Sequence, residues 1–110
     1  MAAELTYAEL LASKGVTLLQ PQDIALRRAD ALTAVEIVRQ LPLPIIGGSV
    51  YFLRNGCVEF AYAAWSCDPR DGENGKDYIT RSCDESRRYI AMFPHRDDVE
   101  PVFLLGIYRR

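Results

Sequence analysis

Apolar positions recur at a helical spacing in the segment from Ala29 to Leu41. Leu32, Val35 and Val38 follow one another at three-residue steps, and the segment stops before Pro42. This spacing puts the apolar side chains on one face of an amphipathic helix. A proline disfavours helical backbone in the residue before it, so the helix is expected to end at that point.

A shorter helix is predicted from Tyr7 to Lys14. Thr6 is a suitable N-cap, and Glu9 three residues later completes a capping box. Gly15 comes directly after the last turn, where glycine commonly ends a helix.

The segment from Pro44 to Trp65 predicts a long β-hairpin. β-branched and aromatic residues fill both halves, and Asn55-Gly56 between them suits the positive φ values of a two-residue type I′ turn. Gly47 and Gly48 lie inside the first half. Glycine weakens a strand unless the backbone bends, bulges or is approached closely, so the first strand is expected to bend there.

A loop from Asp68 to Gly75 and a third helix from Lys76 or Asp77 to Phe93 follow the hairpin. The final run, Val102 to Tyr108, is apolar throughout and predicts a strand near the centre of a sheet. Short extended segments are expected at Val16 to Leu19 and at Asp23 to Leu26, the second as an edge strand. The fold class is therefore α+β, with a small, largely antiparallel sheet, a long central hairpin and about three helices packed on it.

Composition and length predict one globular domain over residues 1–110. The chain is 49% hydrophobic and 25% charged, which suits a chain that buries one modest core. Its longest apolar runs are far shorter than the roughly 20 residues of a membrane-spanning helix. The N-terminus lacks the basic and apolar regions of a signal peptide, so a cytoplasmic location is expected.

The residues that commonly carry catalysis or bind metals are few and poorly spaced. Cys57, Cys67 and Cys83 match no zinc motif and are expected to be free thiols, so no metal or other cofactor is predicted. His95 is the only histidine and lies in a polar segment. Cys67 and His95 could in principle form a thiolate-imidazole pair, but nothing in their spacing demands it. The chain is therefore not expected to be an enzyme.

The net charge of −2 argues against nucleic-acid binding, which needs a basic surface. Acidic residues are concentrated in the second half, with ten acids against six bases between positions 56 and 100. The densest segment runs from Asp68 to Asp77, close to Trp65.

Two interpretations of this acidic aromatic segment stay open. In the first, Trp65 anchors the end of the sheet to the core, and the acids only aid solubility. In the second, the segment is a docking surface for a basic protein, since aromatic anchors supply binding energy and complementary charge speeds association. The candidate anchors are Tyr62 and Trp65, and the candidate steering acids are Asp68, Asp71, Glu73 and Asp77.

The order of these features resembles a known family. The chain is similar to the Imm40-type immunity proteins of bacterial polymorphic toxin systems. The similarity lies in the order of a helix, the run Pro44-Ile45-Ile46-Gly47-Gly48-Ser49-Val50-Tyr51-Phe52, an Asn-Gly turn, a tryptophan at the end of the second strand and the later Asp77–Ile90 segment. The resemblance extends from Ile24 to Tyr108. In that family an acidic residue usually follows the two glycines, whereas this chain has Ser49, so no carboxylate role is expected there.

The resemblance implies a non-catalytic protein that binds and neutralises a cognate toxin domain. Such a domain could be a basic, nuclease-like protein, because an acidic inhibitor would be steered towards a basic substrate groove. The alternative is a small-molecule-binding or enzymatic α+β domain with a pocket near Gly47–Ser49. In that case Ser49, Tyr51, Ser82 and Ser86 should converge on the pocket.

Overall fold

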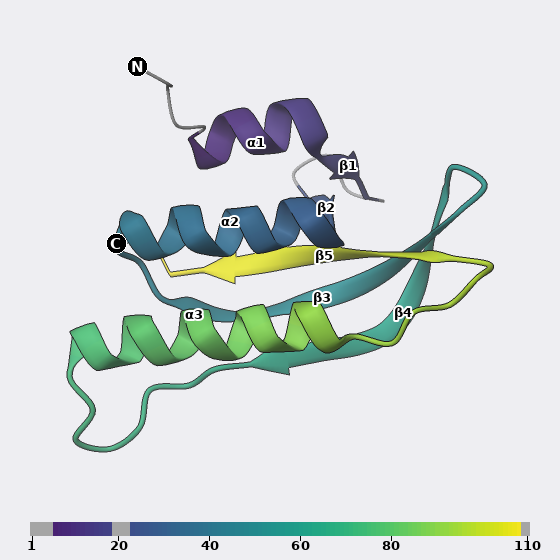
Figure 1. Ribbon diagram of the computed structural model, residues 1–110. Helices are drawn as coiled ribbons and strands as arrows, with labels where there is room; N and C mark the ends of the chain where they lie inside the picture. Colours follow the sequence, from purple (N-terminus) through teal and green to yellow (C-terminus); the bar gives the residue numbers. More distant parts are fainter. Residues whose placement is uncertain (1–5, 19–22, 109–110) are drawn as a thin grey trace.

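A computed structural model describes residues 6–18 and 23–108, and within these ranges three helices accompany one five-stranded sheet (Figure 1). The strand order is β1-β2-β5-β3-β4, and all neighbouring strands are antiparallel. The α+β class predicted from the sequence is confirmed. In chain order the elements are α1 (Tyr7–Lys14), β1 (Val16–Thr17), β2 (Ile24–Arg27), α2 (Arg28–Gln40), β3 (Ile45–Arg54), β4 (Cys57–Ser66), α3 (Gly75–Met92) and β5 (Glu100–Ile107).

The helices form a layer on one side of the sheet. α2 and α3 contact each other and lie against β5 and β3 respectively, while α1 packs beside α2 and β2 (Figure 1). β3 and β4 occupy one side of the sheet, with β4 at its edge, and β5 holds the central position. The central placement of the last strand agrees with its continuous apolar sequence.

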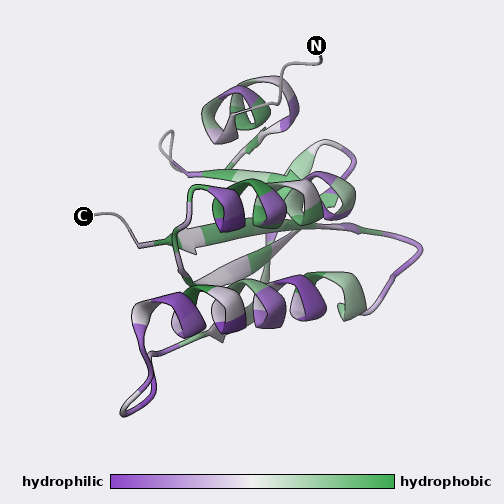
Figure 2. Cartoon of the chain, turned by 60° about the vertical axis from the view of Figure 1, so that its left-hand side comes forward, coloured by the Kyte–Doolittle hydropathy of each residue, from purple (hydrophilic) through white to green (hydrophobic). Residues whose placement is uncertain are grey.

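The main core fills the space between the helix layer and the sheet. Its fully buried members include Leu26, Val35, Ile90 and Phe103. Figure 2 shows the matching pattern, with β5 largely hydrophobic and α3 hydrophilic on the side turned away from the sheet. A smaller cluster around Val102 lies on the opposite face of the sheet, called the open face below.

Local capping signals set the ends of α1 and α3. The Thr6 hydroxyl oxygen accepts from the Glu9 N–H at 3.1 Å, and the Glu9 carboxylate accepts from the Thr6 N–H at 2.9 Å, so the predicted capping box is confirmed. The Asn74 side chain accepts from the Asp77 N–H at 2.8 Å, and α3 therefore begins at Gly75, slightly earlier than predicted.

Arg28 at the start of α2 ties the two long helices together. Its Nη1 donates to the carbonyl oxygens of Ile90 at 2.7 Å and Phe93 at 2.9 Å. These carbonyls belong to the end of α3, where the last turn of any helix leaves acceptors without helical partners. The last turn of α3 has no basic residue of its own, so the neighbouring helix supplies the donor.

The prediction that Asp23 to Leu26 forms an edge strand is wrong. β2 lies between β1 and β5, because Val16 and Thr17 pair with Ala25 and Ile24 on its outer side. The two residues of β1 therefore form this edge of the sheet. Leu19, the end of the first predicted extended segment, lies outside the described residues.

The hairpin turn is the one predicted. Asn55 has φ 50° and Gly56 has φ 80°, and Arg54 pairs with Cys57 across them, as in a two-residue type I′ turn. The predicted irregularity near the glycine pair is also present, because the β3–β5 register shifts between Ile45 and Gly47.

The two glycines admit the backbone and side chain of Trp65. Gly47 has φ 150°, and a Cβ added there would lie 2.3 Å from the Trp65 carbonyl oxygen. A Cβ on Gly48 would lie 2.3 Å from the Trp65 ring and 2.6 Å from the Leu104 carbonyl oxygen. Both positions therefore require glycine for close approach, and the second one seats the indole against β3.

Candidate partner-binding surface

β4 contains a bulge that presents Tyr62 to solvent. Val50 pairs with Ala63 and Tyr51 pairs with Phe60, so Ala61 and Tyr62 are extra residues on the β4 side. Tyr62 has φ 55°, a left-handed backbone conformation that residues other than glycine rarely adopt. The residue is 92% exposed. Bulges commonly re-aim a side chain, and this one turns a tyrosine outward.

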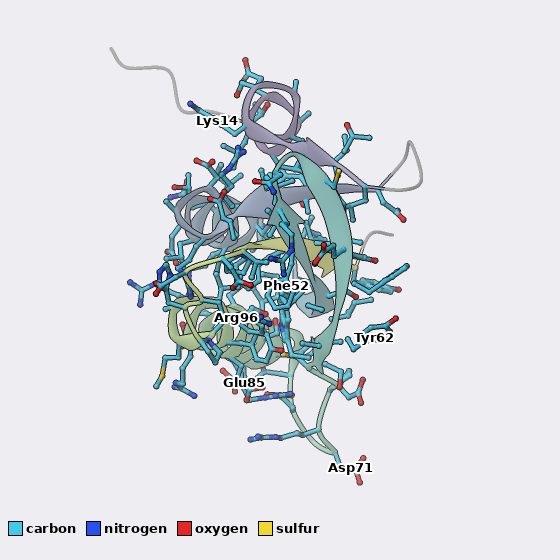
Figure 3. All side chains as sticks on the ribbon, turned by 90° about the vertical axis from the view of Figure 1, so that its right-hand side faces the viewer. Lys14, Phe52, Tyr62, Asp71, Glu85 and Arg96 are labelled. Carbon is cyan, nitrogen blue, oxygen red and sulfur yellow. The ribbon has the colours of Figure 1, made fainter. Side chains whose placement is uncertain are left out.

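Tyr62 continues a row of aromatic rings on the open face. The ring centroids of Tyr51 and Phe60 are 5.8 Å apart, and those of Phe60 and Tyr62 are 5.7 Å apart. Figure 3 shows Tyr62 pointing away from the helices. These three residues are called the aromatic row. Phe60 is 54% exposed, so two rings of the aromatic row, those of Phe60 and Tyr62, lie largely in water.

A shallow hollow lies beside the aromatic row. It is lined by Ser49, Tyr51, Phe60, Tyr62 and Ala64 among others, and it holds roughly 200 Å³. Pockets for small molecules usually hold about 300–1,000 Å³ and enclose most of the ligand.

The serines of the alternative pocket do not converge. Ser82 and Ser86 are fully buried on α3, behind the sheet, whereas Ser49 and Tyr51 line the hollow on the open face. Ser82 accepts a hydrogen bond from the Ile45 N–H at 3.1 Å and donates to Ile79 at 3.2 Å, so it supports the fold.

Trp65 faces the helix layer instead of the open face. Its Nε1 donates to the Ser86 hydroxyl at 3.0 Å, and its ring stacks on Tyr89 with centroids 4.7 Å apart. These contacts join the end of β4 to α3. They match the structural interpretation of Trp65, in which it anchors the sheet to the core, and leave Tyr62 as the exposed aromatic residue of the predicted pair.

Glu73 is engaged inside the protein. Its carboxylate forms a two-point ion pair with Arg81, with N–O distances of 2.7 and 2.8 Å, and its side chain is only 11% exposed. The Arg81 hydrogen bonds, aided by one from the Arg70 N–H, lower the pKa of Glu73 to about 2. Glu73 therefore fixes the loop onto α3 and offers little charge to a partner.

Two further contacts hold the same loop. Arg81 Nη2 donates to the Asp68 carbonyl oxygen at 2.7 Å, and the Tyr78 hydroxyl donates to the Cys67 carbonyl oxygen. The loop between β4 and α3 is thus held at its start as well as at its end. Figure 2 colours most of this loop as hydrophilic.

Three of the predicted steering acids remain exposed. Within residues 6–18 and 23–108, the carboxylates of Asp68, Asp71 and Asp77 form no ion pair and accept no hydrogen bond. Figure 3 places Asp71 at the tip of the loop that follows β4. The structure therefore places exposed aromatic rings on β4 and the unpaired Asp68 and Asp71 in the loop that follows it, while Asp77 lies in the first turn of α3.

The two candidate catalytic side chains, Cys67 and His95, lie in different surroundings. The His95 side chain is 77% exposed and lies 3.5 Å from Asp97, whereas Cys67 is buried and its Sγ lies 3.9 Å from the Ser82 carbonyl oxygen. Burial raises the pKa of the Cys67 thiol, which disfavours the thiolate needed for nucleophilic attack. In the described part of the chain, no three His, Cys, Asp or Glu side chains are grouped to hold a metal ion. No helix there is long and apolar enough to cross a membrane.

The sequence analysis missed two features of this surface. One is Phe60, and the other is the bulge that gives Tyr62 its positive φ. Phe60 alternates with Glu59 and Ala61, so its face could have been assigned from strand periodicity. The bulge depends on how β4 pairs with β3, and no glycine or asparagine marks it in the sequence. It could therefore not be read from local residue preferences.

Comparison with known protein families gives a match over most of the chain. The family described as Immunity protein 40 matches residues 11–107 of the 110-residue chain. No curated protein and no solved structure matches it.

Proposed function

Because the chain belongs to the Immunity protein 40 family, we propose that it is a non-catalytic immunity protein that binds and neutralises a cognate bacterial toxin domain. Binding would block the active site of that domain or the path of its substrate. The observation that carries the proposed surface is the exposure of the aromatic row beside unpaired acids. A large exposed aromatic group of this kind is typical of a protein-binding site.

The two parts of the surface have different roles. Tyr62 and Phe60 provide apolar area that a partner can bury, and this contributes mainly to the lifetime of a complex. Asp68, Asp71 and Asp77 provide negative charge at the border, which acts mainly on the rate of association. Trp65 and Glu73 support this surface from behind through α3.

The charge of this border favours a basic partner. A toxin domain that acts on nucleic acid would carry a cationic substrate groove, and such a groove would attract the exposed acids. We therefore propose a basic, nuclease-like domain as the partner class. An acidic protein that covers the groove would inhibit without any catalytic step of its own.

The test is co-expression with the toxin domain encoded beside this gene. The parent protein should restore growth and form a stable complex with the toxin on size-exclusion chromatography. Tyr62→Asp should abolish protection, because it places a charge at the most exposed end of the aromatic row. Met92→Asp is the matched control, since Met92 is 75% exposed on α3 and lies outside that row.

Protection that survives Tyr62→Asp would leave immunity in place and reject the surface. A parent protein that neither binds nor neutralises the toxin, and instead turns over or tightly binds a metabolite, would reject the function itself.

A further inference from the structure

β4 is a sheet edge with few of the features that usually guard one. Among the described strands it has a neighbour on one side only, and it is ten residues long, whereas β1 at the other edge has two residues. Exposed edges are commonly protected by short length, lysine, proline, inward-pointing charge or a β-bulge. β4 has no lysine or proline, and its one charged residue, Glu59, is held by Arg54 at 3.1 Å. It does contain a bulge, but the part from Ala63 to Ser66 pairs with β3 in a regular register.

The register shows which backbone groups face outward from this edge. Cys67 donates its N–H to the Ile46 carbonyl oxygen at 3.0 Å, so these two residues form a hydrogen-bonded pair. Antiparallel strands alternate hydrogen-bonded and non-hydrogen-bonded pairs. Ser66 and Ala64, opposite Gly47 and Ser49, are then of the second type and turn their N–H and C=O groups away from β3.

The bulge at Ala61 and Tyr62 divides the edge into two parts. The part from Ala63 to Ser66 begins at the exposed Tyr62 ring and leads into the loop that carries Asp68 and Asp71. Ala64 and Ser66 are both exposed and uncharged, so no described side chain of theirs opposes pairing. A partner on this part would meet an aromatic ring at one end and negative charge at the other.

Either a second copy of this chain or a basic protein could pair with this edge, and charge favours one of them over the other. A second copy of the chain carries the same acidic loop, with four acids against two bases between Asp68 and Asp77, so it would bring more negative charge to this edge. A basic protein would bring the opposite charge. The edge therefore suits a basic partner better than self-association.

We propose that the toxin domain adds an extended segment to β4, pairing with the backbone of Ala63–Ser66 and placing a cationic side chain opposite Asp68 and Asp71. This inference rests on the proposed toxin-binding function. In strand addition the main-chain hydrogen bonds supply affinity, and alternate side chains supply specificity through the surfaces that they meet. Here Tyr62 is the apolar surface and the two aspartates are the charged one.

Amide hydrogen exchange measured by NMR tests the pairing directly. In the free protein the Ala64 and Ser66 amides should exchange rapidly, because they face solvent. In the complex with the toxin domain encoded beside this gene, their exchange should slow by more than about tenfold. Val58 lies on the other side of the bulge, where Arg54 and Cys57 flank the two-residue turn as a hydrogen-bonded pair, so the next pair, Leu53 and Val58, turns its amides outward. The Val58 amide is the internal control and should keep its free rate.

Proline substitution tests the same hydrogen bonds. Ala64→Pro removes one outward N–H and should weaken binding by about tenfold, as expected for one lost backbone hydrogen bond. Ala64→Ser keeps the N–H, and Val58→Pro removes an outward N–H outside the proposed pairing; both should bind as the parent does. Trp65 fluorescence and thermal unfolding establish that each variant is folded, and Ser66→Pro replaces Ala64→Pro if that variant does not fold.

The outcomes distinguish this inference from the proposed function. A complex in which Ala64 and Ser66 exchange as fast as in the free protein overturns strand addition and leaves toxin binding intact. A free protein that is dimeric with both amides already protected assigns the edge to a second copy and also overturns it. Failure to bind or neutralise the toxin at all overturns both proposals.

Discussion

Tyr62 combines an unfavourable backbone conformation with nearly complete exposure. A left-handed conformation costs a residue other than glycine about 1–3 kcal/mol, and an exposed ring recovers little of this in the free protein. Such a combination is expected where a side chain serves binding at the expense of stability. The substitution Tyr62→Gly separates the two effects, because glycine accepts the same φ without a side chain.

We expect Tyr62→Gly to raise the free energy of unfolding by about 1 kcal/mol in urea denaturation. The same variant should bind the toxin more weakly, mainly through faster dissociation. Tyr62→Phe keeps the ring and the strain, and it should match the parent in both measurements. A Tyr62→Gly variant that is less stable than the parent would show that the ring contributes to the fold.

Gly48 illustrates a residue whose absent side chain is a packing requirement. In Gly48→Ala the added Cβ would overlap the Trp65 ring and the Leu104 carbonyl oxygen. We expect a loss of about 1–3 kcal/mol in stability, as for other overpacked sites, together with a shifted emission of Trp65, the chain's only tryptophan. Gly75→Ala is the control, because nothing lies within 4 Å of the position of its Cβ, and it should change neither property.

At the scale of elements, the ion pair between Glu73 and Arg81 fixes the acidic loop on α3. The folded pKa of Glu73 is about 2, below its ordinary value of 4.5, so the folded state favours the charged carboxylate. Its contribution to stability is complete above the ordinary pKa and is lost as the pH falls from 4.5 towards 2.

We therefore expect Glu73→Gln to be less stable than the parent at neutral pH, with the difference shrinking below pH 4.5. Thermal unfolding across this pH range measures it. Asp71→Asn is the matched control at neutral pH, because it removes a negative charge without removing an ion pair among the described residues. A Glu73→Gln difference that stays constant down to pH 2 would contradict the assignment.

The elements that sequence predicted well are those set by neighbouring residues. The Asn55-Gly56 turn and the Thr6–Glu9 capping box depend on side chains a few positions apart, and both are confirmed. The position of β2 inside the sheet depends on pairing with β1 and β5, which no local pattern specifies. Strand propensity alone therefore identified the segment but not its neighbours.

The candidate site was predictable to a similar extent. Its location at the end of the hairpin and in the following loop came from composition and aromatic content. The direction of each side chain could not be predicted in this way, because it depends on contacts between distant elements. Trp65, for example, is turned inward by its contacts with Ser86 and Tyr89. Glu73 is likewise engaged by Arg81, eight positions away, through a bend of the chain at the start of α3.

For the molecule as a whole, the net charge of −2 is too small to direct association by itself. The arrangement of charge matters more, since many bases are already paired with acids, as in Arg39–Asp84 and Arg27–Glu100. Unpaired acids in the loop after β4 add a local negative field beside the aromatic row. Fields of this kind act over about 8–10 Å at physiological salt, so they affect encounter more than the bound state.

Neutralising that local field should therefore slow association. The double variant Asp68→Asn with Asp71→Asn should lower the association rate with the toxin by about tenfold at low salt, and reduce the dependence of that rate on salt. Stopped-flow measurements between low and physiological ionic strength determine both quantities. Asp77 is left unchanged, because its carboxylate also favours the first turn of α3.

The control carries the same change of net charge away from the aromatic row, at Asp23→Asn with Asp97→Asn. Asp23 directly precedes β2, which is separated from β4 by β5 and β3, and Asp97 lies beside His95. If attraction depended on total charge, both double variants would slow association equally. If it depends on the position of the loop acids, only the first will do so, and equal rates for that variant and the parent would remove Asp68 and Asp71 from the binding surface.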